Sequence, residues 1–210
     1  MTRPRLSGLY AITPDEPSTE VLLEKVRRAI AGGARAVQYR NKAVDPVTRL
    51  LQAEALASLT RTQDVLFIVN DSVELALAVG ADGVHLGKDD DTIVSARAVL
   101  GNKIVGVSCY ADLDRARSAQ RGGADYVAFG AAFPSPTKPN AVHAPIPLYL
   151  QAMRELSLPI VAIGGITVDN AHALVDTGVD AIAMVSGLFD ADDVTATAAY
   201  FSELFRKARQ

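Results

Sequence analysis

Short apolar runs recur along the whole chain, and a stretch with helical periodicity separates each run from the next. Eight such runs cover residues 6–13, 35–40, 64–70, 82–87, 103–108, 125–130, 159–165 and 180–186. Each run is apolar on both faces, which is typical of parallel strands that are buried on both sides. This repeated alternation of strand and helix, at a spacing of roughly 25 residues, predicts a (β/α)8 TIM barrel. We expect this α/β fold to occupy residues 1–210 as a single domain.

The segments between the runs carry helix signals. Residues 18–31 repeat apolar side chains at the spacing of one helix face, and Gly32 and Gly33 then favour a C-terminal cap. N-terminal caps are predicted at Asp45 before Pro46, at Asn70 or Ser72, and at Thr167.

A glycine-containing joint between helix and strand recurs in AGGARAVQYR, VGADGVHLG, RGGADYVAFG and DTGVDAIAMVSG. In each joint a helix is expected to end at glycine, and an apolar strand begins shortly afterwards. The alternative architecture is a doubly wound open sheet, which would place a glycine-rich fingerprint after the first strand. The corresponding stretch, YAITPDEP, has no glycine, so the barrel is favoured.

Charge and cysteine content exclude several classes of function. The net charge is −3, so we expect no nucleic-acid partner and no binding to an anionic membrane. The single cysteine, Cys109, excludes an internal disulfide framework and suits a reducing, cytoplasmic location. The N-terminal stretch has no long apolar run, so neither a signal peptide nor a transmembrane segment is predicted. The sequence leaves the oligomeric state, including a homo-oligomer, open.

Polar residues gather where the predicted strands end, which is the edge where barrel enzymes hold their active sites. They are Gln38, Arg40, Asn41 and Lys42 after the second run, Asn70 and Asp71 after the third, Lys88 to Asp91 after the fourth, Ser108 in the fifth, and Ser135, Thr137 and Lys138 after the sixth. The seventh run ends in Gly164 and Gly165, and the eighth ends in Val185 and Ser186, followed by Gly187.

The last two strand ends have the composition of a phosphate site. Glycine allows backbone N–H groups to approach an anion, and many barrels bind phosphate after the seventh and eighth strands. Either pair, Gly164–Gly165 or Ser186–Gly187, also suits an ordinary tight turn. Their occurrence together at the matching strands favours phosphate.

Arg40, Lys42 and Lys138 supply three cations at the same edge of an acidic protein. Two aspartates beside them, Asp71 and Asp90, suggest a Mg²⁺ ion that bridges carboxylates to a polyphosphate. The alternatives are that Asp71 caps a helix and that the run 88–91 is solvated, and spacing alone does not choose among its three aspartates. Together, the strand ends predict two anion sites that hold phosphorylated small molecules.

At this point the sequence resembles the thiamine-phosphate synthase family. The matching blocks are VQYRNK (37–42), IVNDSVELALAVGADGVHLGKDD (68–90), IVGVSCY (104–110), FGAAFPSPTKPNA (129–141), PIVAIGGIT (159–167) and AIAMVSGLF (181–189). They follow the family order and span nearly the whole chain. The resemblance implies a (β/α)8 barrel that joins hydroxymethylpyrimidine pyrophosphate to a thiazole phosphate, plain or carboxylated. Thiamine phosphate and pyrophosphate are formed by a dissociative, Mg²⁺-assisted reaction.

The resemblance also implies roles for individual residues. The pyrimidine pyrophosphate would contact Gln38, Arg40, Lys42, Asn70, Ser108 and Lys138, with Tyr39 and Asn41 from the same motif. The thiazole phosphate would contact Ser135, Thr137, Gly165, Val185 and Ser186, and Mg²⁺ would be held by Asp71 and Asp90. The expected catalytic residues are Arg40, Lys42, Ser108 and Lys138. His85 is interpreted as a core residue or a support of the site.

Some features bear on rival functions. Asn41, Ser135 and Asn140 depart from the commonest residues of the family without removing an expected ligand. A thiazole tautomerase of the same fold would keep the phosphate site and lack the pyrophosphate machinery. A phosphosugar isomerase or aldolase would require a strand-end base or a Schiff-base lysine. A binding protein without activity would not require paired metal carboxylates.

Overall fold

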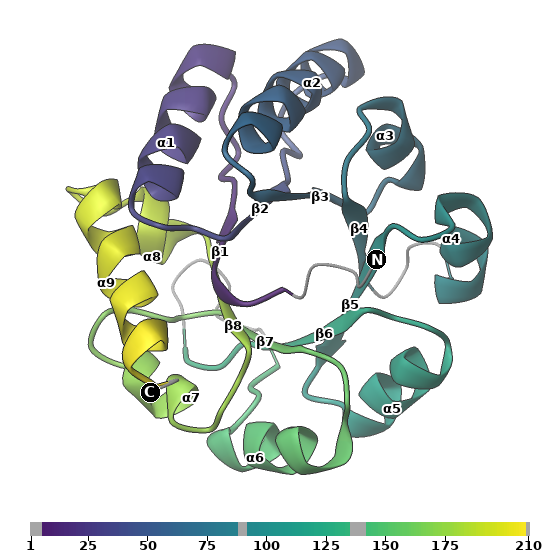
Figure 1. Ribbon diagram of the computed structural model, residues 1–210, viewed down its shortest axis with the longest axis vertical. Coiled ribbons are helices and arrows are strands. Elements are labelled where there is room, and N and C mark those ends of the chain that lie inside the picture. The colour runs from purple at the N-terminus through teal and green to yellow at the C-terminus, as the bar shows by residue number, and fades with distance from the viewer. Residues whose placement is uncertain (1–5, 88–91, 135–141, 209–210) are drawn as a thin grey trace.

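The computed structural model describes residues 6–87, 92–134 and 142–208, and in it eight parallel strands close into a barrel surrounded by helices (Figure 1). The strands are β1 (Gly8–Ile12), β2 (Ala36–Tyr39), β3 (Leu66–Asn70), β4 (Gly83–Leu86), β5 (Ile104–Tyr110), β6 (Tyr126–Phe129), β7 (Ile160–Ile163) and β8 (Ala181–Met184). Each strand pairs with its neighbour in sequence, and β8 pairs with β1 to close the barrel. The predicted TIM barrel is confirmed, and each predicted run corresponds to one strand, with β5 extending two residues beyond its run.

Helices form the outer layer. They are α1 (Thr19–Ala31), α2 (Pro46–Thr62), α3 (Val73–Ala78), α4 (Ile93–Leu100), α5 (Leu113–Arg121), α6 (Ile146–Glu155), α7 (Ala171–Val175), α8 (Ser186–Phe189) and α9 (Val194–Ala208). The short α8 lies between β8 and the long α9, at the place where many barrels insert an extra helix beside a phosphate site. In the described part of the chain, no helix is long and apolar enough to cross a membrane.

The predicted caps are mostly confirmed. The Asp45 carboxylate accepts from the N–H groups of Val47 and Thr48, and Pro46 follows it at the first helical position. Ser72, rather than Asn70, caps α3. Gly32 is the C-cap of α1, and Gly33 has a φ of +100°, which favours glycine.

The predicted cap at Thr167 is wrong. Helix α7 begins only at Ala171, after Asn170. The Asn170 side chain instead ties the preceding turn together, because its Oδ1 accepts from the Thr167 N–H at 2.8 Å and its Nδ2 donates to the Gly165 carbonyl at 2.9 Å. Thr167 is therefore part of the loop after β7, and the helix starts one turn later.

The recurring helix-to-strand joint has a structural cause. Asp82, Asp125 and Asp180 each precede a strand, and their carboxylates accept hydrogen bonds of 2.8, 2.8 and 2.9 Å from a backbone N–H of β3, β5 and β7 respectively. These bonds join neighbouring strands at the N-terminal edge of the barrel. That edge is thereby stabilised, and the opposite edge is left for ligands.

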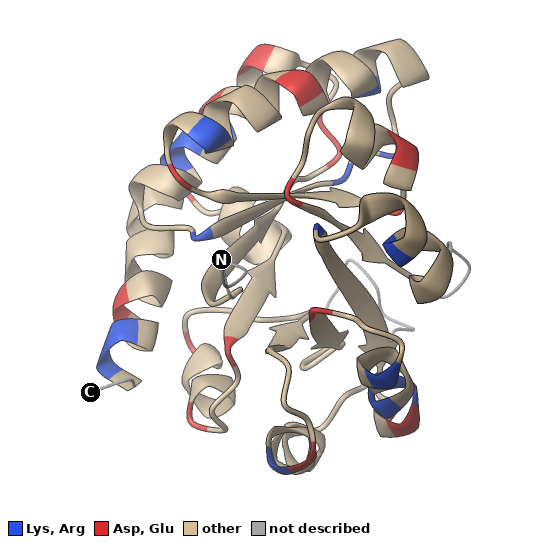
Figure 2. Cartoon of the chain, turned by 45° about the vertical axis from the view of Figure 1, so that its right-hand side comes forward, with Lys and Arg blue, Asp and Glu red and all other residues tan. Residues whose placement is uncertain are grey.

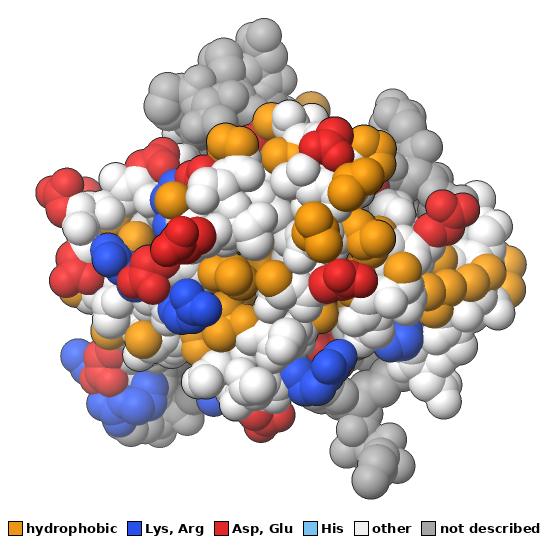
Figure 3. All heavy atoms as spheres, turned by 90° about the horizontal axis from the view of Figure 1, so that it is seen from above, with side chains coloured by type: hydrophobic (Ala, Val, Ile, Leu, Met, Phe, Trp, Pro, Cys, Tyr) orange, Lys and Arg blue, Asp and Glu red, His pale blue; other side chains and the backbone are white. Residues whose placement is uncertain are grey.

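The core has two layers separated by the strands. Tyr10, Ile68 and Tyr126 belong to the cluster inside the barrel, whereas Leu56 and Phe129 belong to the cluster between strands and helices. Figure 2 shows that charged residues lie mainly in the helices and loops, while most of the strand length carries none. On the face shown in Figure 3, apolar and charged side chains are interspersed, which is ordinary for a protein surface.

Candidate active site at the C-terminal edge of the barrel

Strand β2 presents alternate residues to the two layers of the core. Ala36 packs in the inner cluster, whereas Val37 and Tyr39 pack in the outer one. Gln38 therefore points into the barrel, where its Nε2 donates to the Tyr10 hydroxyl at 2.8 Å. This period of two decides which residues of the motif VQYRNK have side chains that reach the barrel mouth.

Tyr39 and Asn41 turn their side chains away from the barrel mouth. The Tyr39 hydroxyl donates to Gln52 Oε1 on α2 at 3.0 Å, and burial raises the pKa of this phenol to about 12. Asn41 Nδ2 donates to the same oxygen at 2.9 Å and to the Glu16 carbonyl at 2.8 Å. An acidic side chain could not make these two donations, which accounts for asparagine at position 41. Both residues also line the pocket described below, and the substrate contacts predicted for them stay a prediction.

The loop after β2 is held by two residues that follow β1. Thr13 Oγ1 donates to the Arg40 carbonyl at 2.8 Å and accepts from the Arg40 N–H at 2.9 Å. Asp15 Oδ1 accepts from the Lys42 N–H at 2.7 Å and lies 3.4 Å from Arg40 Nη1. Thr13 and Asp15 were not among the predicted site residues. The signal that could have identified them is their position in YAITPDEP, as polar residues at the end of the first strand.

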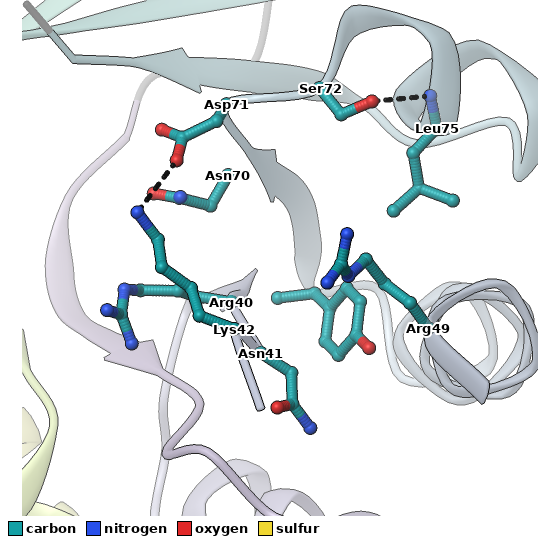
Figure 4. A pocket seen from close by; sticks show the side chains of 9 residues that line it. Arg40, Asn41, Lys42, Arg49, Asn70, Asp71, Ser72 and Leu75 are labelled. Carbon is teal, nitrogen blue, oxygen red and sulfur yellow. Dashed lines mark hydrogen bonds and ion pairs between the residues drawn. The ribbon is translucent and has the colours of Figure 1, made fainter. Parts of the chain in front are cut away.

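Asp71 is presented at the mouth by an unusual backbone conformation. Its φ is +64°, and its N–H donates to the His85 carbonyl at 2.9 Å, which joins the end of β3 to β4. Its carboxylate lies 3.3 Å from Lys42 Nζ (Figure 4). The side chains of Lys42 and Asp71 are 62% and 35% exposed, so both remain accessible to a ligand. The structure therefore brings the predicted cation and the predicted metal ligand together.

A pocket of about 340 Å³ opens beside this pair, between the loops that follow β2 and β3 (Figure 4). Its lining is Tyr39, Arg40, Asn41, Lys42, Arg49, Asn70, Asp71, Ser72 and Leu75. Arg49 on α2 adds a cation that sequence reasoning missed, and its Nη2 donates to the Val44 carbonyl at 3.0 Å. The pocket is cationic, with one carboxylate at its edge.

Inside the barrel, five polar side chains form a continuous network. From Gln38 the hydrogen bonds run to the Tyr10 hydroxyl at 2.8 Å, to the Tyr126 hydroxyl at 2.9 Å, to His85 Nδ1 at 2.9 Å, and from His85 Nε2 to Ser108 Oγ at 2.8 Å. We call this set the interior network. It shows that His85 is a buried residue of the barrel interior and connects two predicted substrate residues, Gln38 and Ser108. Sequence reasoning missed Tyr10 and Tyr126, which read as ordinary apolar positions of strands.

The loops after β7 and β8 approach each other closely. Gly165 has a φ of +66°, and a Cβ at this position would lie 2.3 Å from the Phe133 carbonyl oxygen. A Cβ at Gly187 would lie 2.5 Å from the Ile166 carbonyl oxygen. Packing thus explains both glycines. Among the described residues, the N–H groups of Gly165 and Gly187 also have no hydrogen-bond acceptor, so two donors remain at the place predicted for phosphate.

Four predicted site residues, Asp90, Ser135, Thr137 and Lys138, lie outside the described residues. The flanks of the segment 135–141 are nevertheless placed. The Phe133 N–H donates to the Gly164 carbonyl at 3.0 Å, and the Ala131 N–H donates to the Val142 carbonyl at 2.7 Å. Phe133 therefore lies beside the loop after β7, and Val142 lies beside Ala131 at the end of β6. Within the described residues, no group of three or more His, Cys, Asp or Glu side chains forms a metal cluster.

Comparison with known proteins gives a consistent result. Residues 9–188 match the family described as thiamine monophosphate synthase. The chain is 54% identical over 199 residues to a thiamine-phosphate synthase from Thiobacillus denitrificans, with 94% of each chain covered. It is also 54% identical over 209 residues to one from Methylobacillus flagellatus, covering 98% of this chain and 100% of the relative. A solved thiamine phosphate pyrophosphorylase from Pyrococcus furiosus superposes with a TM-score of 0.88 at 37% identity, with 97% of each chain covered.

Proposed function

The chain belongs to the thiamine monophosphate synthase family and is a transferase of thiamine biosynthesis, and from this premise we propose its substrates and mechanism. The substrates are hydroxymethylpyrimidine pyrophosphate and thiazole phosphate, plain or carboxylated. The bond between the pyrimidine methylene carbon and the pyrophosphate oxygen breaks first, and its electron pair leaves with pyrophosphate. The thiazole nitrogen then supplies the pair for the new C–N bond, which gives thiamine phosphate. From the carboxylated form, the carboxyl group also leaves as CO2 and a proton takes its place on the ring carbon.

The observation that carries this proposal is that Arg40, Lys42 and Asp71 line the same pocket at the barrel mouth. In a dissociative ionisation, negative charge accumulates on the departing pyrophosphate. The backbone that carries Arg40 and Lys42 is held by Thr13 and Asp15, so both cations extend from a fixed loop beside the pocket. Fixed charge aimed at developing charge is the most effective form of electrostatic catalysis.

A divalent cation fits the same place. Asp71 offers a hard, partly exposed carboxylate, which is the ligand type that Mg²⁺ prefers, and Asp90 is the proposed second ligand. When bound, Mg²⁺ would neutralise charge on the pyrophosphate. Lys42 Nζ contacts the Asp71 carboxylate at 3.3 Å. When the substrate and the ion bind, this ion pair would either open or remain while both side chains also contact the ligands.

The second substrate is assigned to the other side of the mouth. The N–H groups of Gly165 and Gly187, which have no acceptor among the described residues, support a phosphate near Val185 and Ser186, at the start of α8. Ser135 and Thr137 are proposed to contact the same phosphate, because Phe133, which precedes them closely in the sequence, lies beside Gly164. Lys138 and Ser108 are proposed to act on the pyrimidine side.

The test is an assay of the purified protein with both substrates, with and without Mg²⁺, in which thiamine phosphate and pyrophosphate are measured separately. We expect the two products in equal amounts and only when Mg²⁺ is present. A thiazole tautomerase would isomerise the thiazole phosphate and leave the pyrimidine pyrophosphate intact. That outcome would overturn the proposal, as would full turnover in the presence of a chelator.

A further inference from the structure

One direction of the interior network satisfies all of its hydrogen-bond donors. Tyr10 accepts a hydrogen bond from Gln38 Nε2, so its own hydroxyl hydrogen is directed to the Tyr126 oxygen. Tyr126 then directs its hydrogen to His85 Nδ1, which must be an unprotonated acceptor. The ring proton of His85 therefore lies on Nε2, which donates to Ser108 Oγ.

The opposite direction would leave a buried hydrogen without a partner. If His85 Nδ1 donated to Tyr126, then Tyr126 would donate to Tyr10. Tyr10 would then accept twice, and its own hydroxyl hydrogen would have no acceptor in a site that is 1% exposed. An unsatisfied buried donor is costly, so the first direction is favoured. Burial also raises the pKa of Tyr10 and Tyr126, which keeps both hydroxyls protonated.

The aromatic rings are held firmly enough to keep this direction. The rings of His85 and Tyr126 are stacked with centroids 5.5 Å apart, and the rings of Tyr10 and Tyr126 meet edge to face at 6.1 Å. Gly106 makes room for Tyr126, because a Cβ there would lie 1.9 Å from the ring carbon Cζ. The rings have little freedom to exchange partners.

The two ends of the interior network are Gln38 and Ser108, both predicted substrate residues. Ser108 Oγ has no hydrogen-bond partner other than His85 among the described residues, so its hydrogen is left to donate. Gln38 Oε1 also has no hydrogen-bond partner in the described part of the chain, and it is not among the fully buried atoms that lack one, so it keeps some access to solvent. The network thus presents one donor and one acceptor at the barrel mouth.

We propose that Tyr126 and His85 are positioning residues that fix Ser108 as a hydrogen-bond donor and Gln38 Oε1 as an acceptor toward the bound pyrimidine. The complementary ligand is a heterocycle whose ring nitrogen accepts from Ser108 and whose amino group donates to Gln38. This identity of the ligand rests on the proposed function. The direction of the network does not.

The first experiment uses the wild-type protein labelled with ¹⁵N-histidine and free of substrates. The ¹⁵N NMR spectrum shows which ring nitrogen of His85 carries the proton, and the His85→Gln variant identifies its signals among the three histidines. We expect the Nε2–H form at neutral pH. The Nδ1–H form or a doubly protonated ring would overturn the inference, even in a protein that makes thiamine phosphate.

The second experiment compares two matched variants, Tyr126→Phe and Tyr10→Phe, each of which removes one hydroxyl from the same network. Only Tyr126→Phe removes the donor to His85, so it alone should produce the Nδ1–H form. It should also raise the KM for hydroxymethylpyrimidine pyrophosphate about tenfold, the value of one ordinary hydrogen bond, and leave the KM for thiazole phosphate unchanged. An unchanged pyrimidine KM, or the same change of protonation in both variants, would overturn the inference. If Tyr126→Phe does not fold, the wild-type spectrum still shows which ring nitrogen of His85 carries the proton, and so still tests the direction of the network.

Discussion

Gly165 offers a sharp test of the loop arrangement at the barrel mouth. In Gly165→Ala, the new Cβ would lie 2.3 Å from the Phe133 carbonyl oxygen and 2.6 Å from the Pro134 carbonyl oxygen. Both neighbours are backbone, so they move only if the loop after β6 moves. Gly80→Ala is the matched control, because its φ is +65° against +66° for Gly165 and its new Cβ would meet only the flexible end of Arg61 at 3.6 Å.

The two variants share one cost and differ in another. Forcing alanine into the left-handed region costs about 1–2 kcal/mol of folding free energy in each. Gly165→Ala adds an overpacking cost of about 1–3 kcal/mol, because the Phe133 carbonyl must retreat by roughly 1 Å to reach an ordinary contact. The displaced loop leads directly to Ser135 and Thr137. A displacement of that size is enough to lower kcat/KM about 100-fold.

The measurements are urea unfolding and steady-state formation of thiamine phosphate with varied thiazole phosphate. We expect Gly165→Ala to lose more stability than Gly80→Ala and to have a much lower kcat/KM for thiazole phosphate, while Gly80→Ala retains wild-type kinetics. Equal losses of stability in the two variants, with unchanged kinetics in both, would refute the close approach of the loops after β6 and β7.

Four further results are expected. Asp71→Asn should lower Mg²⁺-dependent turnover at least about 100-fold with an unchanged circular dichroism spectrum, and normal pyrophosphate release would contradict the metal assignment. Asp15→Ala should lower kcat/KM for the pyrimidine substrate about tenfold, since a charge-assisted bond to the loop after β2 is lost, whereas full activity would show that this loop needs no such tie. Burial raises the pKa of the Cys109 thiol to about 12, so it should react with a thiol reagent at pH 8 only after unfolding, and rapid native labelling would contradict its burial. Burial also raises the pKa of Tyr126 above its usual value of 10.0, so the stability that it contributes is complete below pH 10 and declines as the pH rises further, which unfolding monitored by tyrosinate absorbance measures.

Much of the candidate site was predictable because the strand ends of a barrel converge. Once the alternation of strand and helix indicated a barrel, residues far apart in sequence such as Arg40, Asp71 and Ser108 were expected at one edge. The structure confirms that Lys42 and Asp71 meet. The sequence did not predict that the side chains of Tyr39 and Asn41 point toward α2, unlike those of their neighbours. The direction of each side chain depends on the exact register of β2.

The sequence by itself determined the architecture and the family. Apolar runs of strand length, helix caps and glycine joints are local signals, and each depends on neighbouring residues only. Family motifs such as FPSPTKP are likewise contiguous in the chain.

Only the tertiary structure decided how the site is supported. Thr13 and Asp15 follow β1 yet hold the loop after β2, and Tyr10 meets Tyr126 from a position 116 residues away in the sequence. These contacts depend on barrel closure, strand register and the space left at Gly106. No local pattern encodes them, because the same tyrosine in a strand suits either an apolar core or a polar network. Its hydroxyl acquires a role only when the opposite wall of the barrel supplies its partner.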